Sequence, residues 1–455
     1  MKLGNVVSRL AISSVFVTSA AQAAVTIEEA AQLGSTLTRF GAISAGNENG
    51  SIPAYAAGKI TPPATYKPGM TGGLPNPFAD EKPLFTITAA NMGEYLDKLD
   101  EGTQTLLKRW PDSYKLNVYP THRTAPYPEW VLENTVKNAT LAKLVNAQGD
   151  GVEGAYGGIP FPIPQNGLEV LWNHFLYWQP VAQEGRSPGY LVDAAGGITD
   201  VGVNNVYYEV QYYNPDKDEL DGPYYKLKSA AISPASKAGQ QNLSHYSINY
   251  AEREQNTWNY STGQRRVRLT PDFKYDTPAA PYGGMMFYDE IFLFSGRPDR
   301  FDWELVGKKE MYIPYNAYEQ VASTPQQLLG KQHLNPERQR WELHRVWEVK
   351  ATLKQGARHA AQSRTFFFDE DSWKLVLSAG YDQGGELYRV GQAGCYQVYD
   401  SEPPYMSCPF TMYDLTKGQY TITPVYGGKS GFLRAANLRS PYETTPGGMQ
   451  GSGIR

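Results

Sequence analysis

A recurring alternation of apolar and polar residues constrains the fold of this chain more than any other feature of its sequence. The alternation is clearest in Trp341–Leu353, where Glu342 and His344 point away from the apolar face. We expect the apolar face to meet a dry interior and the polar face to meet water. Similar runs recur from residue 241 onward, with 285–294 among them, at the spacing typical of an antiparallel meander.

The composition favours a mainly β (α+β) protein. Aromatic residues make up 13% of the chain and include 33 Tyr, while 32 Pro and 44 Gly favour turns and extended loops over a helical bundle. Apolar periodicity predicts only three helices, at 26–38, 89–110 and 128–147. We expect a signal peptide (1–23), a Pro/Gly-rich wrapping segment with short helices (24–127), a region with a helix, a Pro-rich motif and the first strands (128–240), and the main antiparallel meander (241–455), with 128–455 forming one domain.

The N-terminus predicts export to the periplasm. Lys2 and Arg9 precede an apolar stretch at 10–20 and the triplet Ala-Gln-Ala, the pattern of a secretory signal peptide cleaved after Ala23. Ala24 cannot receive the acyl chains of a lipoprotein, so we expect an untethered protein without a membrane-spanning segment. The full chain has 42 basic and 46 acidic residues, which gives a formal charge of −4. Removal of the signal peptide with Lys2 and Arg9 would change this charge to −6. This charge argues against nucleic acid and anionic membranes as partners.

The two cysteines of the chain, Cys395 and Cys408, would meet an oxidising compartment after export. We expect them to form a disulfide that closes a short loop and contributes roughly 3 kcal/mol in the chain-entropy model. Their spacing fits neither a C-x-x-C redox motif nor a zinc knuckle, so we expect no metal or redox chemistry from this pair.

A proline-rich run at 157–164, Gly-Gly-Ile-Pro-Phe-Pro-Ile-Pro, predicts a stiff extended rod. Each proline fixes its own φ and favours extended geometry in the residue before it. The rod has two interpretations: it lies across the mouth of an open cavity, or it staples the N-terminal region to the sheet.

Four motifs follow one another along the chain: 157–169 closed by Leu-Trp-Asn-His at 171–174, 258–260 with 263–268, 287–290, and 364–373 with 380–382. Together they resemble an uncharacterised proteobacterial periplasmic family, labelled as a domain of unknown function or as outer membrane lipoprotein-sorting proteins. The resemblance covers nearly all of the predicted mature chain. It implies a fold similar to the lipoprotein carriers LolA and LolB: an incomplete β-barrel made by a large curved antiparallel sheet, with a helix plugging its apolar hollow. The chain departs from LolB in lacking a lipidated cysteine, which favours a shuttle over an anchored receptor.

Aromatic and methionine side chains in the predicted meander are candidates for lining a ligand cavity, because flat rings and flexible Met side chains adapt to acyl chains. The same residue types fit a filled core equally well. The candidates are Trp258, Tyr260, Met285, Phe287, Trp303, Trp347, Phe366 and Phe368.

Arg266 and Arg268 share one face of a predicted strand. This basic stripe suits a carboxylate, a phosphate headgroup or an acidic partner. Alternatively, the two arginines pair across strands with Asp289, Glu290 or Asp302, since such charge ladders are ordinary on solvated sheet faces.

His174 is a further candidate for contact with a headgroup or partner, and the alternative is a structural histidine. The sequence contains no G-x-S-x-G, H-E-x-x-H or G-x-G-x-x-G motif, and no two of the six histidines have helical metal-ligand spacing. The acidic run at 369–371 fits either Ca²⁺ ligands or, as we expect, a hairpin turn. We predict no cofactor and no metal.

These observations favour a periplasmic carrier that shields a hydrophobic or lipid-like ligand and hands it between an inner-membrane exporter and the outer membrane. Its expected partners are that ligand, an inner-membrane transporter and an outer-membrane protein. Two other classes stay open: a hydrolase or other enzyme acting on a hydrophobic compound, with His174 and a neighbouring carboxylate as acid–base groups, and a structural adaptor of an envelope transport complex. The property that separates them is whether the strands enclose an open hollow or a filled core.

Overall fold

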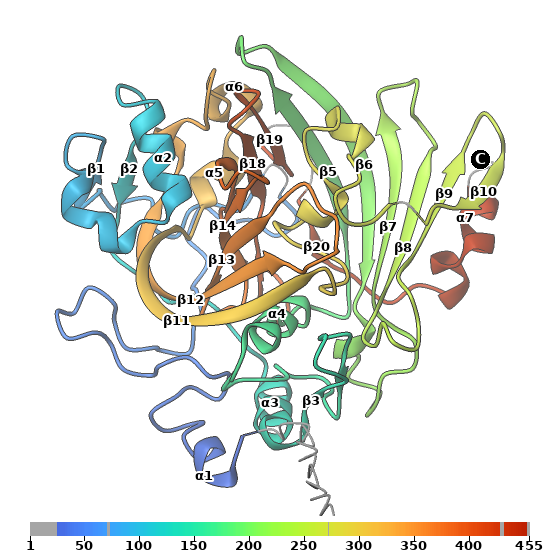
Figure 1. Cartoon of the computed structure of the whole chain (residues 1–455), viewed down its shortest axis with the longest axis horizontal. Coiled ribbons are helices and arrows are strands. Elements are labelled where there is room, and N and C mark those ends of the chain that lie inside the picture. The colour runs from blue at the N-terminus through green and yellow to red at the C-terminus, as the bar shows by residue number, and fades with distance from the viewer. Residues whose placement is uncertain (1–24, 71–72, 272, 428–431, 453–455) are drawn as a thin grey trace, which may run out of the picture.

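A computed structural model describes residues 25–70, 73–271, 273–427 and 432–452 (Figure 1). The predicted signal peptide, residues 1–23, lies outside the described residues. Most strands join one large curved sheet of 16 strands that is not closed into a barrel, and this confirms the expected mainly β fold. Described neighbours pair antiparallel except β2 and β12, which pair in parallel at Val118 and Trp341, so the sheet is mixed.

The strands follow the spatial order β1-β2-β12-β13-β14-β15-β18-β19-β5-β6-β7-β8-β9-β10, with β11 beside β12 and β20 beside β5. Their bounds are β1 Phe85–Ile87, β2 Leu116–Val118, β5 Ala182–Val192, β6 Ile198–Glu209, β7 Pro223–Ser233, β8 Gln241–Ser247, β9 Asn256–Ser261, β10 Arg266–Leu269, β11 Phe301–Pro314, β12 Trp341–Leu353, β13 Ser363–Asp369, β14 Leu375–Tyr381, β15 Leu387–Ala393, β18 Phe410–Asp414, β19 Gln419–Thr423 and β20 Arg434–Ala435. Two small hairpins stand apart: β3 Lys143–Leu144 with β4 Val152–Glu153, and β16 Tyr396–Val398 with β17 Tyr405–Ser407.

The sheet has two wings that meet where β19 pairs with β5. We call β5–β10 the first wing and β11–β15 with β18 and β19 the second wing. Figure 1 shows the first wing in green to yellow-green on the right and most of the second wing in orange to brown at the centre. Strands from both sides of residue 240 belong to the same sheet, because β7 pairs with β8.

The described helices are short. The helix predicted at 26–38 is present only as α1, the one predicted at 89–110 is a 3₁₀ helix followed by α2, and the one predicted at 128–147 is α3. No helix in the described ranges is both long enough and apolar enough to cross a bilayer. The bounds are α1 Ile27–Ala30, α2 Glu101–Arg109, α3 Glu129–Leu141, α4 Gly167–Phe175, α5 Tyr318–Ala322, α6 Pro325–Leu328 and α7 Pro446–Ser452, with 3₁₀ helices at Met92–Lys98, Gln211–Tyr213, Ala280–Tyr282, Tyr288–Glu290, Pro336–Arg338 and Pro441–Thr444.

Helix α4 fills the inner side of the second wing. Asn166 caps it, because its side chain accepts a hydrogen bond from the N–H of Glu169. Gly167 allows a close approach to β12, since a Cβ at this position would lie 2.9 Å from Cγ1 of Val349. The apolar side of the helix, including Trp172, is buried in the core.

The proline-rich run connects α3 to α4. The N–H of Ile159 donates to Oγ1 of Thr135 on α3 at 2.9 Å. The N–H of Phe161 donates to Oδ1 of Asn173 on α4 at 2.9 Å, and Nδ2 of Asn173 donates back to the Phe161 carbonyl at 2.7 Å. These contacts tie the run to both helices.

The first half of β12 is buried on both faces, so the expected wet face is wrong there. Glu342 and His344 are 0% and 1% exposed. The chain around residue 122 covers this face, and the N–H of His122 donates to Oε2 of Glu342 at 2.8 Å. The alternation returns near the end of the strand, where Lys350 and Thr352 are exposed.

The predicted disulfide between Cys395 and Cys408 is confirmed. It closes the loop that contains the β16–β17 hairpin, between β15 and β18 of the second wing. The disulfide therefore ties the two ends of this small hairpin together.

Candidate ligand-binding cavity

A cavity lies over the first wing, between its strands and a covering segment of residues 273–296. It offers about 230 Å³ to the centre of a water molecule, whereas one enclosed water needs only about 10–15 Å³ on that scale. Alternate residues of the strands face it, as the two-residue period of a strand requires. They are Asn204, Val206 and Tyr208 on β6, Leu227, Ser229, Ala231 and Ser233 on β7, Asn242, Ser244 and Tyr246 on β8, and Thr257 on β9.

The covering segment is not the strand predicted at 285–294. It contains two 3₁₀ helices, Ala280–Tyr282 and Tyr288–Glu290, and folds over the cavity. Phe292 has a φ of 58°, in the left-handed region that β-strands do not use. The apolar residue types suggested a strand, but here they are buried by packing against the sheet.

Buried ion pairs anchor the second part of the covering segment to the second wing. Arg364 donates to both oxygens of Asp289 at 3.0 and 3.2 Å, and Nε2 of His359 lies 2.9 Å from Asp289 Oδ2. Nε of Arg389 donates to Glu290 at 2.9 Å. Burial opposes ionisation of Asp289, but Arg364 and His359 lower its pKa to about 2. Burial raises the pKa of Glu290 and outweighs the effect of Arg389.

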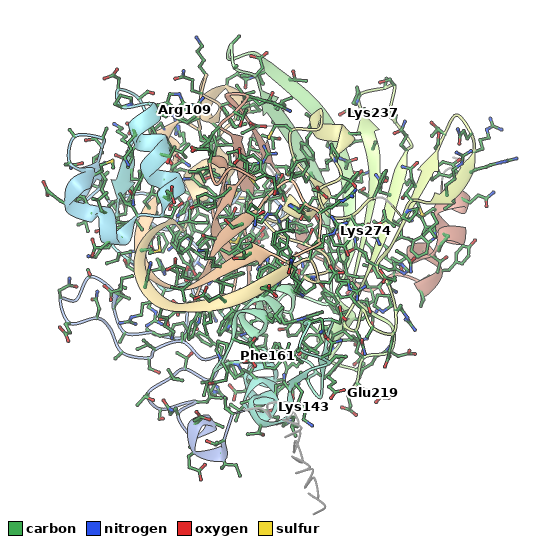
Figure 2. All side chains as sticks on the ribbon, viewed as in Figure 1. Arg109, Lys143, Phe161, Glu219, Lys237 and Lys274 are labelled. Atoms are coloured by element: carbon green, nitrogen blue, oxygen red, sulfur yellow. A yellow bond between two sulfur atoms is a disulfide. The ribbon has the colours of Figure 1, made fainter. Side chains whose placement is uncertain are left out.

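The cavity wall mixes rings, hydroxyls and amides, which suits an amphiphilic molecule better than a pure hydrocarbon. Figure 2 shows two cationic wall residues, Lys237 at the end of the β7–β8 hairpin and Lys274 on the covering segment. Lys274 is paired loosely with Glu254, at 3.8 Å. The aromatic wall residues are Tyr208, Tyr246, Phe273, Tyr275, Tyr282, Tyr288, Phe292 and Phe410.

The two predicted cavity residues on β9 face away from the cavity. Thr257 lines it, so the strand period sends Trp258 and Tyr260 to the opposite face. Tyr260 packs there with Leu243 and Met449, against the C-terminal helix α7, and Trp258 packs against this cluster. A one-residue difference in register thus separates the prediction from the structure.

The predicted residues of the second wing lie in a filled core. Trp303 stacks on Phe366 with ring centroids 5.6 Å apart, and Phe368 is fully buried beside them. Trp347 stacks on Trp373 at 6.3 Å. These four residues line no part of the cavity because α4 occupies the space in front of their wing.

Met285 and Phe287 belong to the covering segment but do not line the cavity either. Both lie beside Arg389: its guanidinium is 5.2 Å from the centroid of the Phe287 ring and 3.6 Å from the sulfur of Met285. The neighbouring Met286 lines the cavity instead. None of the eight predicted side chains therefore contributes to the cavity wall.

Sequence reasoning expected strands in this region but did not select the residues that line the cavity. Their signal was present: from Leu227 to Ser233, the small and apolar residues at every second position follow Lys226 and alternate with Lys228. The pattern indicates that the uncharged face differs from the charged face of the same strand. On the charged face, Nζ of Lys228 donates to the carbonyl of Glu443 in the C-terminal segment at 2.9 Å.

Arg266 and Arg268 are exposed on the edge strand β10. Arg268 lies opposite Asn259, whose side chain donates to the cavity residue Asn242, so the two arginines share the cavity face of the sheet. The expected alternative of pairing with Asp289 or Glu290 is wrong, since those carboxylates bind Arg364 and Arg389. Asp302 lies on β11 of the second wing and is exposed.

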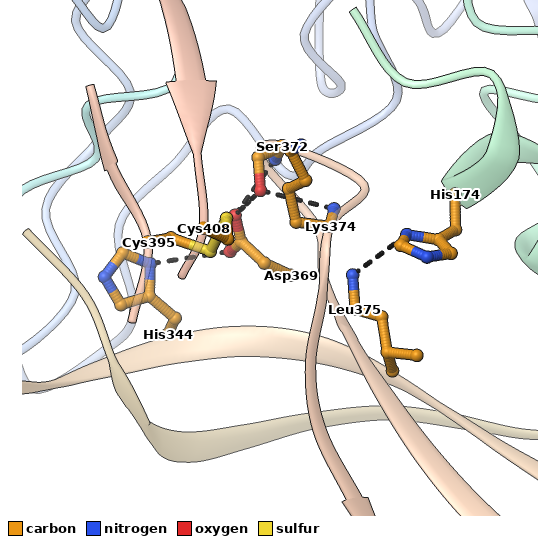
Figure 3. Close-up of a disulfide and its surroundings, with 8 residues drawn as sticks. All are labelled: His174, His344, Asp369, Ser372, Lys374, Leu375, Cys395 and Cys408. Atoms are coloured by element: carbon orange, nitrogen blue, oxygen red, sulfur yellow. Dashed lines mark hydrogen bonds and ion pairs between the residues drawn. A yellow bond between two sulfur atoms is a disulfide. The ribbon is translucent and has the colours of Figure 1, made fainter. Parts of the chain in front are cut away.

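His174 sits inside the filled wing. Its Nδ1 accepts the N–H of Leu375 at 3.1 Å (Figure 3), and the ring also bonds the backbone at Phe294. Burial, followed by the nearby Lys374, lowers its pKa to about 3. These contacts describe a neutral structural histidine that links α4 to β14.

The acidic run after β13 forms a turn, as expected, and its side chains are buried. Nε and Nη2 of Arg123 donate to the two oxygens of Asp371 at 2.9 and 2.6 Å. Oδ1 of Asp369 lies 3.7 Å from Nδ1 of His344 (Figure 3). His344, Asp369 and Asp371 each place one potential ligand atom within 4.8 Å of the others, but Arg123 already neutralises Asp371. The cluster therefore has the character of a buried ion network.

The comparisons with known proteins identify the family. The sequence profile of the family described as "Protein of unknown function (DUF1329)" matches residues 86–448. An uncharacterized protein of Pseudomonas aeruginosa, PA3922, is 40% identical over 443 residues, which cover 95% of each chain.

Three solved structures are similar at low identity. A domain from Vibrio parahaemolyticus named as an outer membrane lipoprotein-sorting protein aligns with a TM-score of 0.43 at 12% identity, over 62% of this chain and 98% of its own. A DUF1329 family protein from Desulfovibrio piger aligns with a TM-score of 0.40 at 12% identity, over 61% and 95% of the two chains. The LolA superfamily protein NE2245 from Nitrosomonas europaea aligns with a TM-score of 0.36 at 8% identity, over 61% and 97%. From the profile match and the Pseudomonas relative, the chain belongs to the DUF1329 family of proteins of unknown function.

Proposed function

We propose that the protein is a periplasmic carrier that holds a hydrophobic or lipid-like ligand in the cavity of the first wing and passes it between an inner-membrane exporter and the outer membrane. The cavity is the observation that supports this proposal. One wing of the sheet is filled by α4, whereas the other leaves room beneath a covering segment. A purely structural adaptor needs no such space.

The chemistry of the wall suits reversible binding. Covering an acyl chain recovers roughly 0.8 kcal/mol per methylene, so a chain of moderate length gives tight but reversible capture. Hydroxyl and amide groups from residues such as Ser229, Asn242 and Thr257 would bind the polar part of an amphiphile. Release requires the covering segment to move away from the first wing.

The basic side chains around the cavity would contact an acidic group. Lys237 and Lys274 line it, and Arg266 and Arg268 are exposed on the same face of the sheet. We assign these four residues to contact with an anionic headgroup or with an acidic surface of a partner protein.

A matched pair of substitutions on β7 tests the proposal. Ala231 lines the cavity, and the next residue, Ile232, is 41% exposed on the opposite face. Ala231→Trp fills the cavity with a large ring, while Ile232→Trp adds the same ring outside it. We expect the uncharged dye N-phenyl-1-naphthylamine to bind the wild type and Ile232→Trp, and to bind Ala231→Trp at least about tenfold more weakly, a difference of about 1.4 kcal/mol.

Native mass spectrometry of the purified protein gives a second measurement, in which a co-purified amphiphile is expected in the wild type and absent in Ala231→Trp. Equal dye binding by the two variants would move the ligand site away from this cavity. A wild type that binds neither the dye nor any co-purified compound would contradict the carrier proposal.

A further inference from the structure

A second, smaller hollow lies directly behind the cavity. It offers about 60 Å³ to the centre of a water molecule. The two hollows share six wall residues: Ser187, Val206, Tyr208, Phe292, Phe410 and Pro424. Because these residues line both hollows, a ligand in the cavity has a second chamber within reach. We call the second hollow the inner chamber.

Lys374 lines the inner chamber. The residue is 7% exposed, and its Nζ lies 3.1 Å from the centroid of the Tyr177 ring. Within the described ranges, no carboxylate forms an ion pair with this lysine. Burial holds its pKa well below the ordinary value.

A buried ammonium without a counter-ion costs several kcal/mol, and cores normally pair such groups. The buried arginines Arg364 and Arg123 follow that rule, since both bind carboxylates in the interior. Lys374 differs from them, and an anion bound beside it would supply the missing counter-ion. Figure 3 shows it beside the disulfide, between the acidic turn and β14.

The rest of the inner chamber suits a carboxylate on an apolar chain. Gln179 and Gln183 supply amide groups, with Nε2 of Gln183 donating to Oε1 of Gln179 at 2.9 Å, and Ser407 supplies a hydroxyl. Phe292 and Leu433 supply apolar wall. The volume of the inner chamber suffices for a compact polar group such as a carboxyl group and is too small for a bulky headgroup.

We propose that Lys374 anchors the carboxylate of a fatty-acid-like amphiphile, whose chain extends from the inner chamber into the cavity of the first wing. This inference deepens the proposed carrier function and rests on it. If the acid arrives protonated, its O–H proton passes to the neutral amine, and a neutral ion pair forms without net charge entering the interior. The exposed basic residues at β10 then serve an acidic partner.

Dodecanoate and dodecan-1-ol test the anchor, because they share one chain and differ in the head group. Displacement of N-phenyl-1-naphthylamine from the mature protein reports the affinity of each. We expect the wild type to prefer dodecanoate at least tenfold, which is about 1.4 kcal/mol. Lys374→Met keeps the side-chain length but removes the amine, so the preference should disappear. Lys350→Met removes an exposed charge from β12, outside both hollows, and should retain the preference.

The possible failures are distinguishable. Equal affinity of the wild type for the acid and the alcohol would overturn the anchor and leave the carrier proposal intact. The same preference in Lys374→Met as in the wild type would also overturn it. If the dye and both compounds fail to bind the wild type, the carrier proposal and the anchor fall together.

A chemical measurement on the wild type covers the case in which Lys374→Met does not fold. A water-soluble carbodiimide activates the bound carboxylate, an amide forms between its carbon and a nearby lysine amine, and the carbodiimide becomes a urea by taking up the elements of water. Peptide mass spectrometry should place the dodecanoyl group on Lys374. Coupling confined to Lys237 or Lys274 would overturn the proposal.

Discussion

Asp369 is buried where its negative charge is unfavourable. Burial, followed by the neighbouring carboxylate of Asp371, raises its pKa to about 6. Its Oδ1 has no hydrogen-bond partner within the described residues. The folded protein thus keeps a proton that the unfolded chain releases above about pH 4. Ionisation of this carboxylate therefore costs stability, and the cost grows as the pH rises from about 4 to about 6.

We predict that Asp369→Asn stabilises the protein at pH 7.5 by roughly 1 to 3 kcal/mol, since one pKa unit corresponds to about 1.36 kcal/mol. Asn can still accept the hydrogen bonds from Ser372, and its amide can donate to Nδ1 of His344. At pH 4.5 the wild-type carboxyl is protonated, so the gain should disappear. Urea denaturation at the two pH values measures both free energies of unfolding.

The same substitution two residues later is the control. Asp371→Asn deprives the buried Arg123 of its counter-ion, and it should destabilise the protein at both pH values, by about 3 kcal/mol or more. A stabilisation by Asp369→Asn that is equal at pH 4.5 and 7.5 would contradict the assignment of the raised pKa to this residue.

The conformation or bonding of a single residue was predictable where its own chemistry and that of its sequence neighbours decide it. The run at 369–371 was correctly expected to form a turn, and Cys395 and Cys408 were correctly expected to be joined. Burial of the turn was not predictable, because it depends on Arg123 arriving from a segment about 250 positions earlier in the chain. An acidic turn on the surface and one that binds a buried arginine have the same local sequence.

Among the elements, the covering segment shows how a hinge can arise from uneven anchoring. Residues 285–294 are held to the second wing by the ion pairs of Asp289 and Glu290. Residues 273–284 contain one short 3₁₀ helix and are held by contacts such as the half-exposed ion pair of Asp276 with Arg300 at 3.0 Å. We therefore expect the first part to open more readily than the second.

We predict that Asp289→Ala destabilises the protein by about 3–5 kcal/mol, because Arg364 would remain buried without its counter-ion. Asp302→Ala, which removes an exposed carboxylate from β11, should change stability by less than about 0.5 kcal/mol. Chemical denaturation of both variants measures the difference. Equally small effects would show that the covering segment does not depend on this ion pair.

An element could be predicted from the sequence where its own residues decide its conformation, and could not where distant residues decide it. The strand Trp341–Leu353 has the predicted bounds, since its period-two pattern is set by its own residues. The segment 285–294 has equally apolar residues and is not a strand, because its carboxylates are drawn to arginines on the second wing. A sequence pattern records that residues will be buried, and tertiary partners decide in which conformation.

At the scale of the whole molecule, the two wings use similar residue types for opposite purposes. Trp303 and Phe366 fill the second wing, while Tyr208 and Tyr246 border the open cavity of the first. The choice depends on where α4 docks, and this long-range contact leaves no mark in the strand sequences. The large curved sheet was therefore predictable, but the location of its hollow was not.

The same asymmetry predicts how the molecule responds to a ligand. Hydrogen–deuterium exchange should be faster in residues 273–284 than in β13 and β14, whose strands are buried on both faces. Dodecanoate at a concentration of about 100 times its Kd should stabilise the state in which residues 273–284 cover the cavity, by about 2.7 kcal/mol. Hydrogen–deuterium exchange in 273–284 should therefore slow by about 100-fold. Exchange in β13 and β14 should change little, and Ala231→Trp should show no response in any segment. Uniform slowing throughout the sheet would instead indicate stabilisation against global unfolding, in which case residues 273–284 would not be the part that opens.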